Sequence, residues 1–139
     1  MGMRIMAFDY GTKRIGIAVT DSLQIIASPL TTIHPEEIWK FIADYISKEE
    51  VETFVLGKPL QLDGSPSESA QHVVGFRRKL QKTYPHIPVV EMDERFTSKI
   101  ASRAIAQSGM KKSKRQDKQL IDQVSAVLIL QTYMESKSF

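Results

Sequence analysis

Cysteine is absent from this chain of 139 residues, which excludes disulfide bonds, thiolate nucleophiles and cysteine zinc sites. Long apolar runs are also missing, since none approaches the roughly 20 residues that a membrane-spanning helix needs. The first residues, MGMRIMAFD, pass directly into strand-like sequence, so we expect no signal peptide, and Met6 breaks the myristoylation pattern that Gly2 would begin. Together these absences predict a cytoplasmic protein with no membrane partner.

Histidine is scarce as well. His34, His72 and His86 lack the spacing of zinc ligands, and we interpret them as surface residues. No stretch resembles the nucleophile elbow of serine hydrolases. The turn at residues 57–59 lacks the spacing of a phosphate-binding P-loop, although Lys58 follows a predicted central strand, where a cation could meet a phosphate. The candidate chemistry is therefore left to carboxylates and basic residues.

Positive charge is small in total and concentrated in one place. The net charge is +3, and the segment KKSKRQDK at residues 111–118 holds five basic residues and one acid, which leaves the rest of the chain at −1. Such a run attracts phosphate backbones or acidic lipid surfaces, and the alternative is a solvated loop. Its basic residues are Lys111, Lys112, Lys114, Arg115 and Lys118.

Apolar periodicity predicts five strands and four helices in a single domain that spans residues 1–139. The strands are expected at residues 4–10, 14–21, 28–33, 53–58 and 87–94, and the helices at 35–48, from Ser65 onward, at 97–108 with a stop at Gly109, and at 119–134. A Ser-Pro start with Glu68 gives the second helix a capping box. The last helix is apolar around most of its circumference, so we expect it to be largely buried, and the small residues Ser125 and Ala126 would let it approach the sheet closely.

The order of these elements predicts the topology. The first two strands are separated only by GTK and should form an antiparallel hairpin, whereas crossover helices make the last two strands parallel. We therefore expect an α/β fold with a mixed five-stranded sheet, three strands antiparallel and two parallel, and helices on both faces.

Acidic residues occupy places where a charged side chain is costly to bury. Asp9 lies inside the first strand, Asp93 and Glu94 end the last strand, and Asp122 lies in the first turn of the last helix. Ligands of α/β sheets usually bind near the carboxyl ends of strands. Carboxylates that converge from separate elements suit hard cations such as Mg²⁺ or Mn²⁺, and the set favours a metal site.

Each acid also has a purely structural explanation. Asp9 could accept backbone N–H bonds from the GTK turn, and Glu94 could pair with Arg95. Asp122 could complement the positive N-terminus of its helix.

Four motifs, DYGTKRIGIAVTD, GKPLQLDG, DERFTS and KQLIDQVSA, occur in this order along nearly the whole chain. Together they resemble the YqgF family, also called RuvX, of Holliday junction resolvases and ribosomal RNA maturation nucleases. The resemblance implies an RNase H-like fold and metal-dependent hydrolysis of phosphodiester bonds in nucleic acid. The implied role is 5′-end processing of pre-16S ribosomal RNA, with the ribosome as a partner, and the alternative is cleavage of four-way DNA junctions. The oligomeric state stays open between a monomer and a weak homodimer.

Carried over position by position, the resemblance implies that Asp9, Glu94 and Asp122 are the catalytic, metal-binding acids, with Asp93 as a rival metal ligand. The basic residues inside the matching motifs are the implied phosphate contacts: Lys13, Arg14, Lys58 and Arg95. One departure stands out, because many RNase H-like nucleases carry a carboxylate where this chain has Gly57 and the lysine after it. The number of metals therefore stays open.

The resulting hypothesis is an endonuclease in which one metal activates water and a second stabilises the leaving 3′ oxygen, while the basic run holds the phosphate backbone. Two alternatives stay open. A sugar-kinase or actin-like ATPase also opens with Asp-x-Gly on a hairpin, but it needs two such domains. A non-catalytic nucleic-acid or ribosome-binding module would use the same basic run and is favoured by the missing fourth carboxylate.

Overall fold

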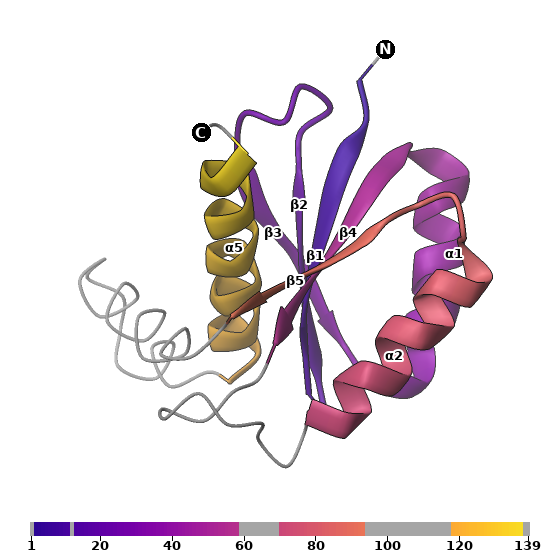
Figure 1. Ribbon diagram of the computed structural model, residues 1–139. Coiled ribbons are helices and arrows are strands. Elements are labelled where there is room, and N and C mark those ends of the chain that lie inside the picture. The colour runs from indigo at the N-terminus through magenta and orange to yellow at the C-terminus, as the bar shows by residue number, and fades with distance from the viewer. Residues whose placement is uncertain (1, 12, 59–69, 94–117, 138–139) are drawn as a thin grey trace.

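The computed structural model describes residues 2–11, 13–58, 70–93 and 118–137 (Figure 1). Its strands are β1 (Arg4–Tyr10), β2 (Ile15–Thr20), β3 (Ala27–Ile33), β4 (Val51–Lys58) and β5 (Val89–Asp93), and its helices are η1 (Pro35–Glu37, a 3₁₀ turn), α1 (Ile38–Lys48), α2 (Ala70–Thr83) and α5 (Lys118–Lys137). The helix expected at residues 97–108, its stop at Gly109 and the capping box at Ser65 and Glu68 lie outside the described residues.

The strands form one mixed sheet in the order β3-β2-β1-β4-β5. β1 pairs antiparallel with β2, and β2 with β3, whereas β1 pairs parallel with β4, and β4 with β5. Figure 1 shows α5 on one face of the sheet and α1 with α2 on the other. The predicted five-stranded mixed sheet with helices on both faces is confirmed.

Two apolar layers hold these helices to the sheet, and β1 contributes to both. Met6 and Phe8 belong to the layer under α1 and α2, whereas Ile5 and Ala7 belong to the layer under α5. Successive side chains of a strand point to opposite faces, so a strand covered on both sides reads as a continuous apolar run. This alternation also decides to which face each later residue of β1 points.

The first helical segment begins differently from the prediction. His34 Nδ1 accepts a hydrogen bond from the backbone N–H of Glu36 at 3.1 Å and caps the 3₁₀ turn, so the α-helix starts only at Ile38. Ile38 and Ile42 are buried as the periodicity predicts. All three histidines are exposed, which confirms that they are surface residues.

Helix α5 is less buried than predicted. Ser125, Ala126, Ile129 and Leu130 are buried against the sheet, while the helix's other described apolar residues are half-buried, because only one side of a helix can face a sheet. The helix runs from Lys118 to Lys137, so it is longer at both ends than the predicted 119–134. None of the helices within the described ranges has the length and apolar content to cross a membrane.

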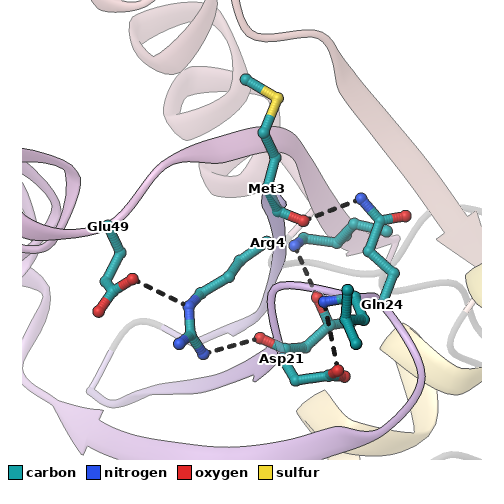
Figure 2. Close-up of polar contacts among 8 residues, drawn as sticks. Met3, Arg4, Asp21, Gln24 and Glu49 are labelled. Carbon is teal, nitrogen blue, oxygen red and sulfur yellow. Dashed lines mark hydrogen bonds and ion pairs between the residues drawn. The ribbon is translucent and has the colours of Figure 1, made fainter. Parts of the chain in front are cut away.

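The turn between β2 and β3 is fixed by the Asp21 carboxylate (Figure 2). Its Oδ1 accepts hydrogen bonds from the backbone N–H groups of Ile25 and Ile26, both at 2.8 Å. These bonds, that from Ile26 foremost, lower the pKa of Asp21 from its ordinary value of 3.8. Beside it, Arg4 forms an ion pair with Glu49 at 3.2 Å. This polar cluster lies at the end of the sheet where β1 begins, opposite to the end described next.

Candidate active site

Asp9 is the second-last residue of β1 and is half-buried. The antiparallel register places it directly opposite Gly16 of β2. Opposed residues project to the same face of a sheet, and Asp9 follows Ile5 and Ala7 at intervals of two. The Asp9 side chain therefore lies on the α5 face, at the edge where β1 ends. Asp9 takes part in polar or electrostatic interactions there, so its carboxylate is not a free charge.

Gly16 brings α5 to this point. A Cβ atom added to Gly16 would lie 2.2 Å from the backbone oxygen of Asp122 and 3.0 Å from its Cβ. Opposed Cβ atoms of an antiparallel pair are about 5 Å apart, so the Cβ atoms of Asp9 and Asp122 are separated by at most about 8 Å. The structure thus brings together two of the three predicted catalytic acids.

Asp122 is held in place by Arg14, which lies just before β2. The Arg14 Nε and the Asp122 Oδ2 are 2.7 Å apart, and the two side chains are 35% and 19% exposed. A charge-assisted hydrogen bond of this length fixes the carboxylate orientation. Asp122 is the fifth residue of α5 and lies in its second turn, not in its first as predicted. A favourable interaction with the positive helix N-terminus therefore accounts less well for a carboxylate at this position.

The hairpin that carries Arg14 is tight. The backbone N–H of Gly11 donates to the Arg14 carbonyl oxygen at 2.9 Å, which closes the turn between β1 and β2. Arg14 therefore belongs to the turn, and β2 begins one residue later than predicted. Lys13, the other basic residue of this turn, is exposed.

Ser125 lies one turn after Asp122 and is only 1% exposed. Its Oγ has no hydrogen-bond partner within the part of the chain that the structure describes. A buried hydroxyl without a partner is costly, so such a group commonly signals a missing water, ion or ligand. Ser125 and Ala126 are packed on the sheet as predicted, and both help α5 to approach β2.

The remaining expected site residues are placed in part or lie outside the described residues. Lys58 and Asp93 are paired in the backbone register at the ends of β4, which neighbours β1, and of β5, the edge strand beyond it. Lys118 is the first residue of α5, so the basic run ends inside a helix and not in a loop. The following residues lie outside the described ranges: Glu94, Arg95, Lys111, Lys112, Lys114 and Arg115.

Metal-binding chemistry rests on the two described aspartates. Within the described ranges there is no group of three or more His, Cys, Asp or Glu side chains that could hold a metal. Asp9 and Asp122 nevertheless offer hard carboxylate oxygens from two neighbouring elements, with the unsatisfied Ser125 hydroxyl one helical turn after Asp122, and this donor chemistry fits Mg²⁺ or Mn²⁺. A third carboxylate would have to come from outside those ranges.

Two features escaped the sequence reasoning. The first is Gly16, although a signal exists: Gly16 and Ala18 are small residues two apart, and both lie on the face that receives α5. The second is a pocket that Trp39 and Lys79 line on the opposite face of the sheet. No local pattern pairs these two residues, because they come from different helices.

Comparison with known proteins gives a consistent picture. A family model described as RuvX, Holliday junction resolvase, matches residues 3–136. A protein of Parabacteroides distasonis is 51% identical over 136 residues, covering 98% of this chain and 97% of its own length, and one of Bacteroides thetaiotaomicron is 49% identical, covering 98% and 99%. Both relatives bear the name "Putative pre-16S rRNA nuclease".

Solved structures show the same fold at low sequence identity. The Fowlpox virus resolvase in complex with Holliday junction DNA has a TM-score of 0.60 and 14% identity, with 97% of this chain and 99% of that chain covered. RuvC of T. thermophilus in complex with a Holliday junction substrate has a TM-score of 0.57 and 16% identity, with 98% and 96% covered. The predicted RNase H-like fold is confirmed.

Proposed function

The chain belongs to the RuvX family, and on that premise we propose that it is a nuclease that hydrolyses phosphodiester bonds at the site formed by Asp9 and Asp122. The observation that carries the proposal is the contact at Gly16, which brings carboxylates from β1 and α5 to one edge of the sheet. The ion pair with Arg14 accounts for the position of Asp122 alone, whereas a shared cation would account for the approach of both carboxylates.

The residues that would hold a divalent cation are Asp9 and Asp122, with Glu94 as the third ligand and Asp93 as its rival. When bound, the cation supplies charge neutralisation at the phosphate and a more acidic water. Both aspartates are half-buried, and the ion pair with Arg14 fixes the orientation of the Asp122 carboxylate. Ser125, one turn further along α5, has a buried hydroxyl that a bound water or ion would satisfy.

Arg14 has two tasks in this proposal. In the structure described here it neutralises Asp122, which would otherwise face Asp9 as a second negative charge. With the site loaded, the guanidinium is released and contacts the phosphate of the substrate, for which its planar fork is well suited. Lys13 is exposed in the same turn and adds a second cation for the backbone.

The name shared by the relatives favours pre-16S ribosomal RNA as the substrate. Within that reading we propose processing at the 5′ end, with the ribosome as a partner. The family description favours a second candidate, cleavage of four-way DNA junctions. Matched substrates separate the two: an RNA with the 5′ precursor sequence and a DNA junction of similar length, each with Mn²⁺ and with EDTA. The faster reaction identifies the substrate class.

The proposal is tested by Asp9→Asn. This variant keeps the size of the side chain but loses the charge that would bind a cation, so we expect cleavage to be abolished while the thermal unfolding midpoint stays near that of wild type. Asp44→Asn is the matched control, since Asp44 is exposed on α1 and pairs with Lys48. If Asp9→Asn cleaves at the wild-type rate at equal metal concentration, the site is wrong. If wild type binds nucleic acid but never cleaves it with Mn²⁺, the chain is a non-catalytic binding module.

A further inference from the structure

A pocket of about 320 Å³ is lined by residues of α1, α2 and the end of β1. Figure 1 shows α1 and α2 on the face of the sheet opposite to α5. Three aromatic residues, Tyr10, Trp39 and Phe76, form its wall, and Gln71, His72 and Lys79 are its polar lining residues. The polar three are exposed, so the pocket has an apolar interior and a polar rim. The volume lies at the lower end of the range of small-molecule sites, and the aromatic wall offers ring faces on which a planar group can stack.

The aromatic wall is rigid. Phe76 is 5% exposed and lies between the other two rings, with centroid distances of 4.8 Å to Tyr10 and 5.3 Å to Trp39. Trp39 itself is half-buried, and the Lys79 ammonium lies over its ring, 4.5 Å from the centroid. A cation over an indole marks a ring face that is open to a ligand or an ion and is not covered by core packing.

Gly75 keeps the pocket open. It lies in the middle of α2, where glycine costs about 1 kcal/mol relative to alanine. Packing does not require it, because a Cβ atom added there would meet nothing within 4 Å. No neighbouring residue therefore requires a glycine at position 75. A bound ligand would, because a larger side chain there would occupy the space that the ligand uses.

Charge and position indicate which ligand this is. Helix α2 has no acidic residue, and its exposed Arg78, Lys79 and Lys82 attract phosphates, whereas Arg77 is half-buried and pairs with Glu91. Tyr10 directly follows Asp9 in β1, and the alternation of the strand places the two on opposite faces of the same sheet edge. A nucleic-acid strand that passes over the end of the sheet where β1 ends would run from the two aspartates on one face to the pocket on the other.

We propose that the pocket binds an unpaired base of the nucleic-acid substrate by stacking on Trp39. The base would take the place over the indole that the Lys79 ammonium occupies, and the ammonium would then pair with the adjacent phosphate. Stacking on an aromatic side chain tolerates every base, because each has a π-face. The inference rests on the proposed nuclease function and adds that the substrate is single-stranded next to the cleavage site.

The chain's single tryptophan makes the test direct, since all tryptophan emission comes from Trp39. The full-length protein is titrated in EDTA with a 12-nucleotide single-stranded RNA, an abasic strand of equal length, a duplex and AMP. We expect quenching by the single strand only, while anisotropy shows that the abasic strand still binds through its phosphates. Equal quenching by the abasic strand or the duplex would overturn the proposal. Quenching by AMP at the same concentrations would assign the pocket to a free nucleotide instead.

Variants give an independent measurement. Gly75→Leu fills the pocket with a good helix former, and Trp39→Leu removes the ring, so anisotropy should show about tenfold weaker binding of the single strand for each. Gln81→Leu, an exposed position of α2 that does not line the pocket, is the matched control and should bind like wild type. Unchanged binding by Gly75→Leu and Trp39→Leu would refute the assignment. Since no cleavage is measured, a failed nuclease assay leaves this result interpretable.

Discussion

The contact between Gly16 and Asp122 predicts a large effect for a very small substitution, Gly16→Ala. The added methyl carbon would lie 2.2 Å from the Asp122 backbone oxygen and 2.5 Å from its carbonyl carbon. Both atoms belong to the backbone of α5, so no side-chain rotation can relieve the overlap. Normal carbon contacts are about 3.5 Å, and the start of α5 must therefore move by about 1 Å away from β2.

Two consequences follow from this displacement. Overpacking of this kind costs about 1–3 kcal/mol, which should lower the thermal unfolding midpoint by several degrees. The shift also moves Asp122 away from Asp9. Misplacement of catalytic groups by about 1 Å costs about 10²-fold in rate, so cleavage should fall far more than stability does.

A control on the same strand separates the two effects. Val19 is buried in the layer on the opposite face, so Val19→Ala destabilises β2 through a cavity without moving α5. Thermal unfolding and cleavage under conditions where every variant is folded are the assays. We expect Val19→Ala to lose stability but keep the wild-type rate, whereas Gly16→Ala loses both. Wild-type stability and rate for Gly16→Ala would refute the close approach of helix and strand.

Three further predictions follow from contacts described above. Arg14→Gln removes the cation that competes for Asp122, so calorimetric Mn²⁺ affinity should rise several-fold, and unchanged affinity would contradict this. Gly75→Ala should raise the free energy of unfolding in urea by about 0.5–1 kcal/mol, because the new methyl meets no neighbour and the helix gains a better former. Asp21→Asn removes a carboxylate whose pKa backbone N–H groups hold below 3.8. Its contribution to stability is complete above pH 3.8 and is lost as the pH falls through the lowered value. Denaturation midpoints of wild type and Asp21→Asn should therefore differ at neutral pH and converge in acid, and a constant difference down to the lowest pH would be inconsistent with this.

Local pattern predicted most of the fold. The bounds of β1 agree with the structure, because an apolar run between a basic residue and a glycine turn leaves little freedom. Strand β2 is one residue shorter at each end than predicted, because Arg14 belongs to the turn before it and Asp21 to the turn after it. The apolar period predicts helix α1, but not that it is preceded by a 3₁₀ turn capped by His34, a form that is common at helix N-termini.

The sequence predicts candidate acids but not their arrangement in space. Asp9 and Asp122 stand out in the sequence because charge is costly in apolar surroundings. Their approach depends on Gly16, and the Arg14–Asp122 pair spans 108 residues, a separation at which periodicity carries no information. Likewise, periodicity gives the apolar face of each helix but not the mutual rotation that brings Lys79 over Trp39.

The docking of α5 also bears on how the protein is made. Asp9, Arg14 and Gly16 leave the ribosome early, whereas Asp122 is synthesised 108 residues after Arg14. Among the described elements, α5 is the one that covers Ile5, Ala7, Ala18 and Val55, so this apolar layer stays open until α5 packs on the sheet. A chain cut short before α5 would thus be an inert product with an exposed apolar surface, the kind of molecule that chaperones and proteases remove. The candidate site is therefore completed only after α5 has been synthesised and has packed on the sheet.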